Sequence, residues 1–176
     1  MTTRMNRTLC ALMAATALVA GVAGCATPVV LGGVALGGMM AIDRRTAGTQ
    51  IEDETIELRS SNRIHGAYGD KAHVNVTSYN RQVLITGEVG TAEARQEVEK
   101  IITGVENVRS VVNELAVMPS TSLGQRSNDT FITGKMRASL VDARDLSANS
   151  FKVVTERNTV YLMGLVTQRE AARATS

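Results

Sequence analysis

VLITGEV, at residues 83–89, decides the fold of this chain, because VYLMGLV, at residues 160–166, repeats its pattern. Both stretches are rich in apolar and β-branched residues, and both close on a Gly-x-Val triplet. Such short runs are typical of β-strands. A pattern that recurs at this length predicts two copies of one structural unit, and each unit can be followed outward from its strand.

A polar turn and an earlier strand precede each of these stretches. We predict the turns at Ser78–Gln82 and Glu156–Thr159, so that the two turns differ by one residue in length. With these turns, Val76-Thr77 in the first copy matches Val154-Thr155 in the second. Strand, polar turn and strand in this order predict a β-hairpin in each copy.

A helix is expected after each hairpin. In the first copy it spans Thr91–Thr103 and stops at Gly104, and a third strand follows through Val111–Val117. In the second copy Thr167 and Glu170 have the spacing of a capping box that opens the same helix. No third strand follows in the second copy, so we expect that unit to be truncated at its C-terminus.

A further helix is expected before each hairpin. In the first copy it spans Thr55–Ile64, and in the second it is capped by Asn128 or Asp129. Three apolar residues on one face of the second helix are expected to form its core side: Ile132, Met136 and Leu140.

The elements together predict an α+β chain of two small modules, each with the order helix–strand–strand–helix–strand. We place the first module at residues 46–117 and the second, incomplete module at residues 127–176. Residues 118–126 are rich in Ser, Thr, Pro and Gly and are expected to be the linker.

The N-terminus has the features of an exported and anchored protein. Arg4 and Arg7 precede an apolar run, and Val22-Ala23-Gly24-Cys25 resembles the lipobox of bacterial lipoproteins. The resemblance implies that residues 1–24 are a signal peptide and that Cys25 is cut free and carries fatty chains such as palmitate. In that case residues 25–45 are a glycine-rich tether, closed by a juxtamembrane basic pair, Arg44-Arg45. The alternative is that the segment stays uncleaved as a helix with a buried Cys25.

Charge and composition argue against several classes of function. After residue 24 the chain has equal numbers of basic and acidic side chains, whereas a nucleic-acid binder usually has a basic excess. We therefore expect no nucleic-acid partner. Both cysteines lie in the N-terminal apolar stretch, and His65 and His73 show no clear carboxylate partner, so we predict no metal site and no cofactor. The acidic run at residues 52–54 and Glu57 are expected to be solvated, and we predict no catalytic residue.

The strand and helix pattern resembles the BON domain. Gly87-Glu88-Val89 and the segment Gly104-Val105-Glu106-Asn107-Val108 carry the resemblance in the first copy, and Met163-Gly164-Leu165-Val166 carries it in the second. With the lipobox, these motifs make the chain similar to the dual-BON outer-membrane lipoproteins.

The resemblance implies a non-enzymatic protein of the outer membrane that faces the periplasm. Lipoproteins of this type bind anionic phospholipid, are associated with envelope integrity and envelope stress tolerance, and are linked to the β-barrel assembly machinery. In that type the first helix of the second domain touches the lipid, which corresponds to Asp129–Val141 here.

The residue pattern of that helix agrees with a membrane-facing side. Residues 46–119 carry a net charge of −4 and residues 120–176 a net charge of +3. An apolar strip with basic edges suits an anionic membrane surface, and its predicted members are Phe131, Gly134, Lys135, Arg137, Ala138 and Val141. The alternative from geometry is that Phe131 packs on the first module or on the linker.

Two functions remain open from the sequence. The favoured one is an envelope-maintenance lipoprotein that binds anionic phospholipid through its second module. The alternative is a protein-interaction module that supports outer-membrane protein assembly, with the acidic first module as its contact surface.

Overall fold

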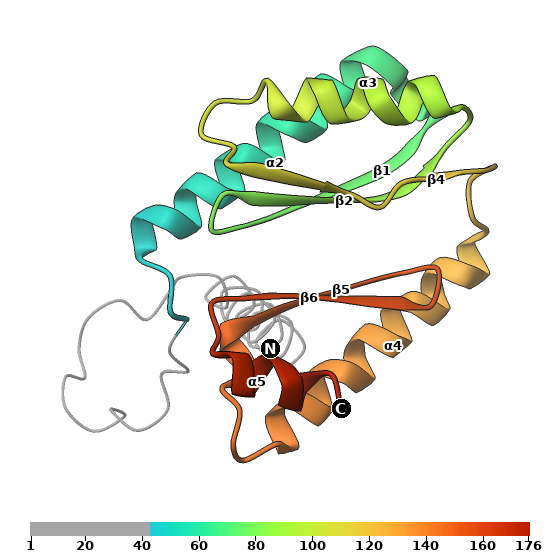
Figure 1. Cartoon of the computed structure of the whole chain (residues 1–176). Coiled ribbons are helices and arrows are strands. Elements are labelled where there is room, and N and C mark those ends of the chain that lie inside the picture. Colours follow the sequence, from blue (N-terminus) through green and yellow to red (C-terminus); the bar gives the residue numbers. More distant parts are fainter. Residues whose placement is uncertain (1–42) are drawn as a thin grey trace, which may run out of the picture. The chain divides into compact units, whose positions relative to one another are not determined.

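A computed structural model describes residues 43–176 of the protein, and these residues form two α+β modules (Figure 1). The predicted signal peptide, Cys25 and all but the last residues of the tether lie outside the described residues. No helix in the described part of the chain is both long enough and apolar enough to cross a membrane.

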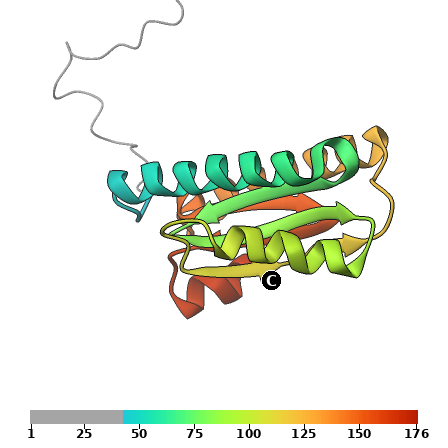
Figure 2. The same ribbon diagram turned by 90° about the horizontal axis from the view of Figure 1, so that it is seen from above.

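Module 1 is a sheet covered on one face by two helices, α2 and α3 (Figures 1 and 2). The central strand of the sheet is β2, which is antiparallel to β1 and parallel to β3 and β4. The elements in chain order are α2 (Ala47–Tyr68), the 3-10 turn η2 (Gly69–Lys71), β1 (His73–Tyr79), β2 (Gln82–Val89), α3 (Ala92–Thr103), β3 (Ser110–Asn113) and β4 (Ala116–Val117).

The core of module 1 lies between this sheet and its two helices. The central strand supplies Val83 and Ile85, both with no exposed surface, and α3 supplies Val98 and Ile102. Burying a branched side chain of this kind contributes about 1.5–3 kcal/mol, which explains why the two apolar faces come together. The predicted helix at Thr91–Thr103 is confirmed, with Thr91 as its N-cap and Gly104 as its C-cap.

Module 2 repeats the first four elements, but its sheet has two strands. Its elements are α4 (Leu123–Asp142), the 3-10 turn η3 (Ala148–Ser150), β5 (Phe151–Glu156), β6 (Thr159–Gly164) and α5 (Gln168–Ala174). The capping box predicted at Thr167 and Glu170 is present at the start of α5. The α+β fold class and the shorter second module are therefore confirmed.

The first helix of each module begins earlier than predicted. Helix α2 starts at Ala47, where the Thr46 side chain accepts a hydrogen bond from the Thr49 amide, and not at Thr55. Helix α4 starts at Leu123 with Ser122 as its cap, so the prediction of Asn128 or Asp129 as the cap is wrong. The coil between the modules therefore ends at Ser122, inside the segment predicted as the linker, because a polar first turn leaves no apolar stripe to mark it.

Both hairpins turn through two residues, which corrects the predicted turns. The turn residues are Asn80-Arg81 and Arg157-Asn158, and all four have positive φ, between 49° and 64°. Positive φ at both positions is the geometry of a type I′ turn, whose twist matches that of paired strands. Because the turns are equal in length, Val76 matches Val153 and not Val154.

The glycine of each Gly-x-Val triplet lies against the beginning of the partner strand. A Cβ atom at Gly87, which has φ of 115°, would lie 2.0 Å from the carbonyl oxygen of His73. At Gly164 the corresponding atom would lie 2.6 Å from the carbonyl oxygen of Ser150. Only glycine fits such a close backbone approach, which explains why the residue recurs in both copies.

Candidate functional site

The predicted lipid-binding strip is an exposed face of α4. All six of its residues are solvent-exposed, and the apolar side chains at its two ends, Phe131 and Val141, are 65% and 70% exposed. The ammonium group of Lys135 lies 5.7 Å from the centre of the Phe131 ring, so a cation and an aromatic face stand together at the surface. Phe131 does not pack on the first module.

The opposite face of α4 packs on module 2. Leu140 is buried there, while Ile132 and Met136 are half-buried, and the helix lies against strand β5 (Figure 1). The core face predicted for this helix is therefore present, and the exposed strip is what remains on its outer side.

The C-terminal end of the strip borders a hollow of about 550 Å³. Its lining includes Arg137 and Val141 from the strip, together with Asp43 and Arg45 from the beginning of the described chain. The place where the predicted tether would enter the fold is thus next to the strip.

Two adjacent arginines bind both modules at this entry point. The guanidinium group of Arg44 donates to both carboxylate oxygens of Glu170 in α5 and to the carbonyl oxygen of Leu165. The Arg44 guanidinium, together with donors from Thr167, lowers the pKa of Glu170 to about 2. Arg45 instead donates to Asp43 and to Asp53 of module 1, at 2.8 Å each. The two arginines predicted as a juxtamembrane basic pair are thus both held by carboxylates of the described chain.

Two acidic residues of α2 are bound to the hairpin. Asp53 is 1% exposed and accepts hydrogen bonds from the Ser78 hydroxyl and from the turn amides of Asn80 and Arg81, at 2.6–2.7 Å. Glu57 accepts from the Ser78 amide at 2.7 Å. The expectation of a solvated run is therefore wrong for Asp53 and Glu57, because the fold brings the turn onto the helix, whereas Glu54 is exposed as expected.

Asp129 has the same role in module 2. It is 5% exposed, and its carboxylate accepts from the amides of Arg157 and Asn158, at 3.0 and 2.8 Å. A carboxylate from the first helix therefore holds the type I′ turn in both copies. The shared role of Asp53 and Asp129 can be predicted from the sequence only when the two-residue turns that they bind are placed correctly.

The junction of the modules is made of polar contacts from both hairpins. The hydroxyl of Tyr79 donates to the carbonyl oxygen of Ser150 at 3.1 Å, and Tyr79 is 4% exposed. From the other side, Arg157 donates to the carbonyl oxygen of Gly87 at 2.7 Å. The first hairpin therefore contacts module 2 through the end of strand β1, and the second hairpin contacts module 1 through its turn.

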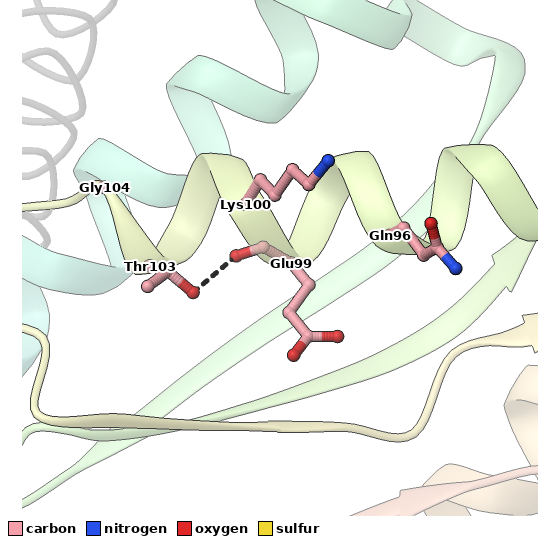
Figure 3. Close-up of a pocket in the computed structure, with 5 residues that line it drawn as sticks. All are labelled: Gln96, Glu99, Lys100, Thr103 and Gly104. Carbon is pink, nitrogen blue, oxygen red and sulfur yellow. Dashed lines mark hydrogen bonds between the residues drawn. The ribbon is translucent and has the colours of Figure 1, made fainter.

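Helix α3 carries a further group of polar side chains, drawn in Figure 3. The hydroxyl of Thr103 donates to the carbonyl oxygen of Glu99 at 2.8 Å, and the Glu99 carboxylate accepts from Asn113 at 2.9 Å. Gln96 and Lys100 are exposed on the same helix. These contacts are local to module 1, and we assign no ligand to them.

Comparisons with known proteins agree with the repeated fold. The family model "BON domain" matches residues 52–119 and again residues 128–176. The outer membrane lipoprotein DolP of Haemophilus influenzae is 39% identical over 154 residues, which are 86% of this chain and 79% of that protein. The 21 kDa hemolysin of Actinobacillus pleuropneumoniae is 31% identical over 135 residues, 76% of this chain and 70% of that protein.

These matches cover both modules, and the DolP match extends over most of the chain. The two segments matched by the family model contain the two hairpins. These hairpins share the Gly-x-Val triplet, the two-residue turn and the helix carboxylate that binds the turn. The chain therefore belongs to the BON family, as a lipoprotein of the dual-domain DolP type.

Proposed function

We propose that this protein binds anionic phospholipid through the exposed strip of α4 and thereby helps to maintain the integrity of the outer membrane. The observation that carries the proposal is the exposure of all six strip residues, with the apolar Phe131 and the cationic Lys135 adjacent. An apolar side chain gains free energy in the lipid interface, and each nearby cation contributes about 1 kcal/mol toward an anionic leaflet.

We further propose that Cys25 is acylated and holds the chain on the periplasmic face of the outer membrane, with no catalytic activity of its own. The name of the Haemophilus relative and the lipobox-like residues before Cys25 support this. Mass spectrometry of the protein extracted from bacterial membranes is expected to show a start at Cys25 with acyl chains attached. An unmodified and uncut N-terminus would contradict the anchor.

The strip can be tested with a matched pair of variants. A fragment of residues 43–176, the part of the chain that the structure describes, is mixed with vesicles with or without phosphatidylglycerol and sedimented. Phe131→Glu is expected to weaken binding about tenfold or more, because burial of one large apolar side chain contributes about 1.5–3 kcal/mol. Binding by the unchanged fragment should also weaken as salt is raised.

Leu58→Glu is the control, because Leu58 on α2 is 63% exposed, nearly the same as Phe131. It introduces the same charge on the acidic module and is expected to leave vesicle binding unchanged. Equal binding to neutral vesicles, or equal losses in the two variants, would exclude α4 as the lipid-binding face.

A second candidate function is contact with a protein of the outer-membrane assembly machinery through module 1. The observation in its favour is that Ile51 and Leu58 are exposed at 66% and 63% on α2, in a module with net charge −4. Under this function Leu58→Glu is the damaging variant and Phe131→Glu the silent one. The two variants therefore separate the two functions.

A further inference from the structure

Three side chains with metal-ligating atoms meet at the junction of the modules: His73, Glu88 and Glu156. One ligand atom from each lies within 4.8 Å of the others. His73 and Glu88 are direct partners across β1 and β2, with the Nδ1 atom of His73 3.0 Å from the Oε2 atom of Glu88. Glu156 comes from the end of β5, in the other module. The sequence expectation that His73 lacks a carboxylate partner is therefore wrong.

Glu88 has an oxygen atom that the surrounding protein does not satisfy. Its side chain is fully buried, and its Oε1 atom has no hydrogen-bond donor among residues 43–176. The Nη1 atom of Arg157 lies 3.6 Å away, beyond hydrogen-bond distance, because it donates to the carbonyl oxygen of Gly87 instead. A buried carboxylate oxygen without a donor is costly, and an ion or a water is the usual explanation.

Glu156 is also short of partners. It is 3% exposed, and within the described part of the chain its carboxylate accepts one hydrogen bond, from the neutral amide of Asn75 at 2.9 Å. Two buried carboxylates this close repel each other when both are charged. The guanidinium of Arg157 offsets the charge of Glu88, whereas Glu156 forms no ion pair among residues 43–176, although Arg126 lines the same cavity.

The other end of the junction shows what a direct contact looks like. Tyr79 ends β1 as Glu156 ends β5, and its hydroxyl crosses to the other module. It donates to the carbonyl oxygen of Ser150 at 3.1 Å and accepts from the amide of Leu165 at 3.4 Å. Within residues 43–176, no such direct hydrogen bond joins Glu156 to His73 or Glu88. The side-chain amide of Asn75 lies between them, because it donates to Glu156 at 2.9 Å and lies 3.4 Å from the Nε2 atom of His73. A cation bound here would take the place of this exposed amide.

We propose that His73, Glu88 and Glu156 bind a divalent transition-metal ion of the Zn²⁺ type, and that the ion fastens module 1 to module 2. Imidazole nitrogen and carboxylate oxygen are ordinary zinc ligands, and bonds of about 2.0–2.1 Å in a tetrahedron place neighbouring ligand atoms about 3.3 Å apart. The three ligand atoms lie within 4.8 Å of one another, so side-chain adjustment of about an ångström brings them to this value. An adjoining cavity of about 180 Å³, lined by His73 and Glu156, has room for a water molecule as the fourth ligand.

Zinc binding is measured on the full chain, extracted from membranes in detergent, stripped with a chelator and with its thiols blocked by iodoacetamide. Zn²⁺ is titrated in competition with a chromogenic chelator. We expect one ion per chain, and at least about tenfold weaker binding in His73→Gln and in Glu156→Gln. His65→Gln is the control, because His65 is the other histidine and is exposed on α2. Its affinity should be that of the unchanged protein.

A second measurement uses the unchanged protein and so does not depend on the folding of any variant. Zn²⁺ is expected to protect His73, but not His65, from modification by diethyl pyrocarbonate, as read by mass spectrometry. Zn²⁺ should also raise the melting temperature, because it binds the folded form. Three results would each overturn the proposal. They are the absence of stoichiometric zinc binding, an affinity for zinc in His73→Gln equal to that of the unchanged protein, and a modification of His73 by diethyl pyrocarbonate that zinc does not reduce.

Discussion

A single buried carboxylate organises the contact between helix α2 and the first hairpin. Burial alone would raise the pKa of Asp53, but hydrogen bonds from Ser78, from the turn amides and from Arg45 hold it below its ordinary value. The charged form is therefore favoured in the folded protein. Since the pKa is lower in the folded state than in the unfolded chain, the carboxylate stabilises the fold at neutral pH.

Asp53→Asn is expected to lower the free energy of unfolding at pH 7 by about 1–3 kcal/mol, because donors in the turn and on Arg45 lose a charged acceptor. The contribution of Asp53 is fully present above its unfolded pKa of about 3.9 and is lost as the pH falls through its lower, folded value. The stability gap between the unchanged protein and the variant should therefore close in acid. Urea unfolding followed by circular dichroism between pH 7 and pH 2 measures it.

Glu54→Gln provides the control for this experiment, because Glu54 is an exposed neighbour on the same helix. It is expected to change the free energy of unfolding by no more than about 0.5 kcal/mol. A gap for Asp53→Asn that stays constant down to pH 2 would mean that the carboxylate charge is not what holds the turn.

Among the elements, the hairpins and the helices that follow them could be predicted from the sequence. Strands such as residues 83–89 have a local apolar pattern, and the cap at Thr167 is a local motif, so neither depends on distant contacts. The predicted lengths of the turns are wrong, because Asn80-Arg81 and Arg157-Asn158 contain no glycine, the usual sign of positive φ.

The beginnings of α2 and α4 could not be found in the same way. Their first turns are polar, and Ser122 stands in a stretch whose composition is typical of a linker. The strip on α4 was accessible to sequence analysis because helical periodicity places its residues on one side. The cluster around Glu88 was not, because its members come from two hairpins and meet only when the register of both is known.

At the scale of the molecule, the short second module depends on the first. A two-stranded hairpin is marginal by itself, and the described residues of module 2 supply no third strand to widen it. The hydroxyl of Tyr79, buried at the junction, bonds the carbonyl oxygen of Ser150 and the amide of Leu165. Contacts of this kind make the two modules one unit.

Tyr79→Phe is therefore expected to loosen module 2 in particular. Hydrogen exchange read by mass spectrometry should show faster exchange in residues 151–164, by about five- to thirtyfold, which corresponds to a loss of about 1–2 kcal/mol. Strand β2 in module 1 should exchange at its original rate, because its core does not include the Tyr79 hydroxyl.

Tyr68→Phe is the comparison, because the hydroxyl of Tyr68 also donates a hydrogen bond, to the Glu97 carboxylate, but does so at the surface and within module 1. It should leave residues 151–164 unaffected. Equal acceleration in both variants, or none in either, would show that the modules are not coupled through Tyr79.

The neighbouring arginines at the start of the described chain have a mechanical consequence. Arg44 is bonded to α5 and Arg45 to α2, so one peptide step connects the incoming chain to both halves of the protein. A pull along the backbone from the N-terminal side would therefore be shared between the two guanidinium contacts, so that neither half of the protein takes the force alone.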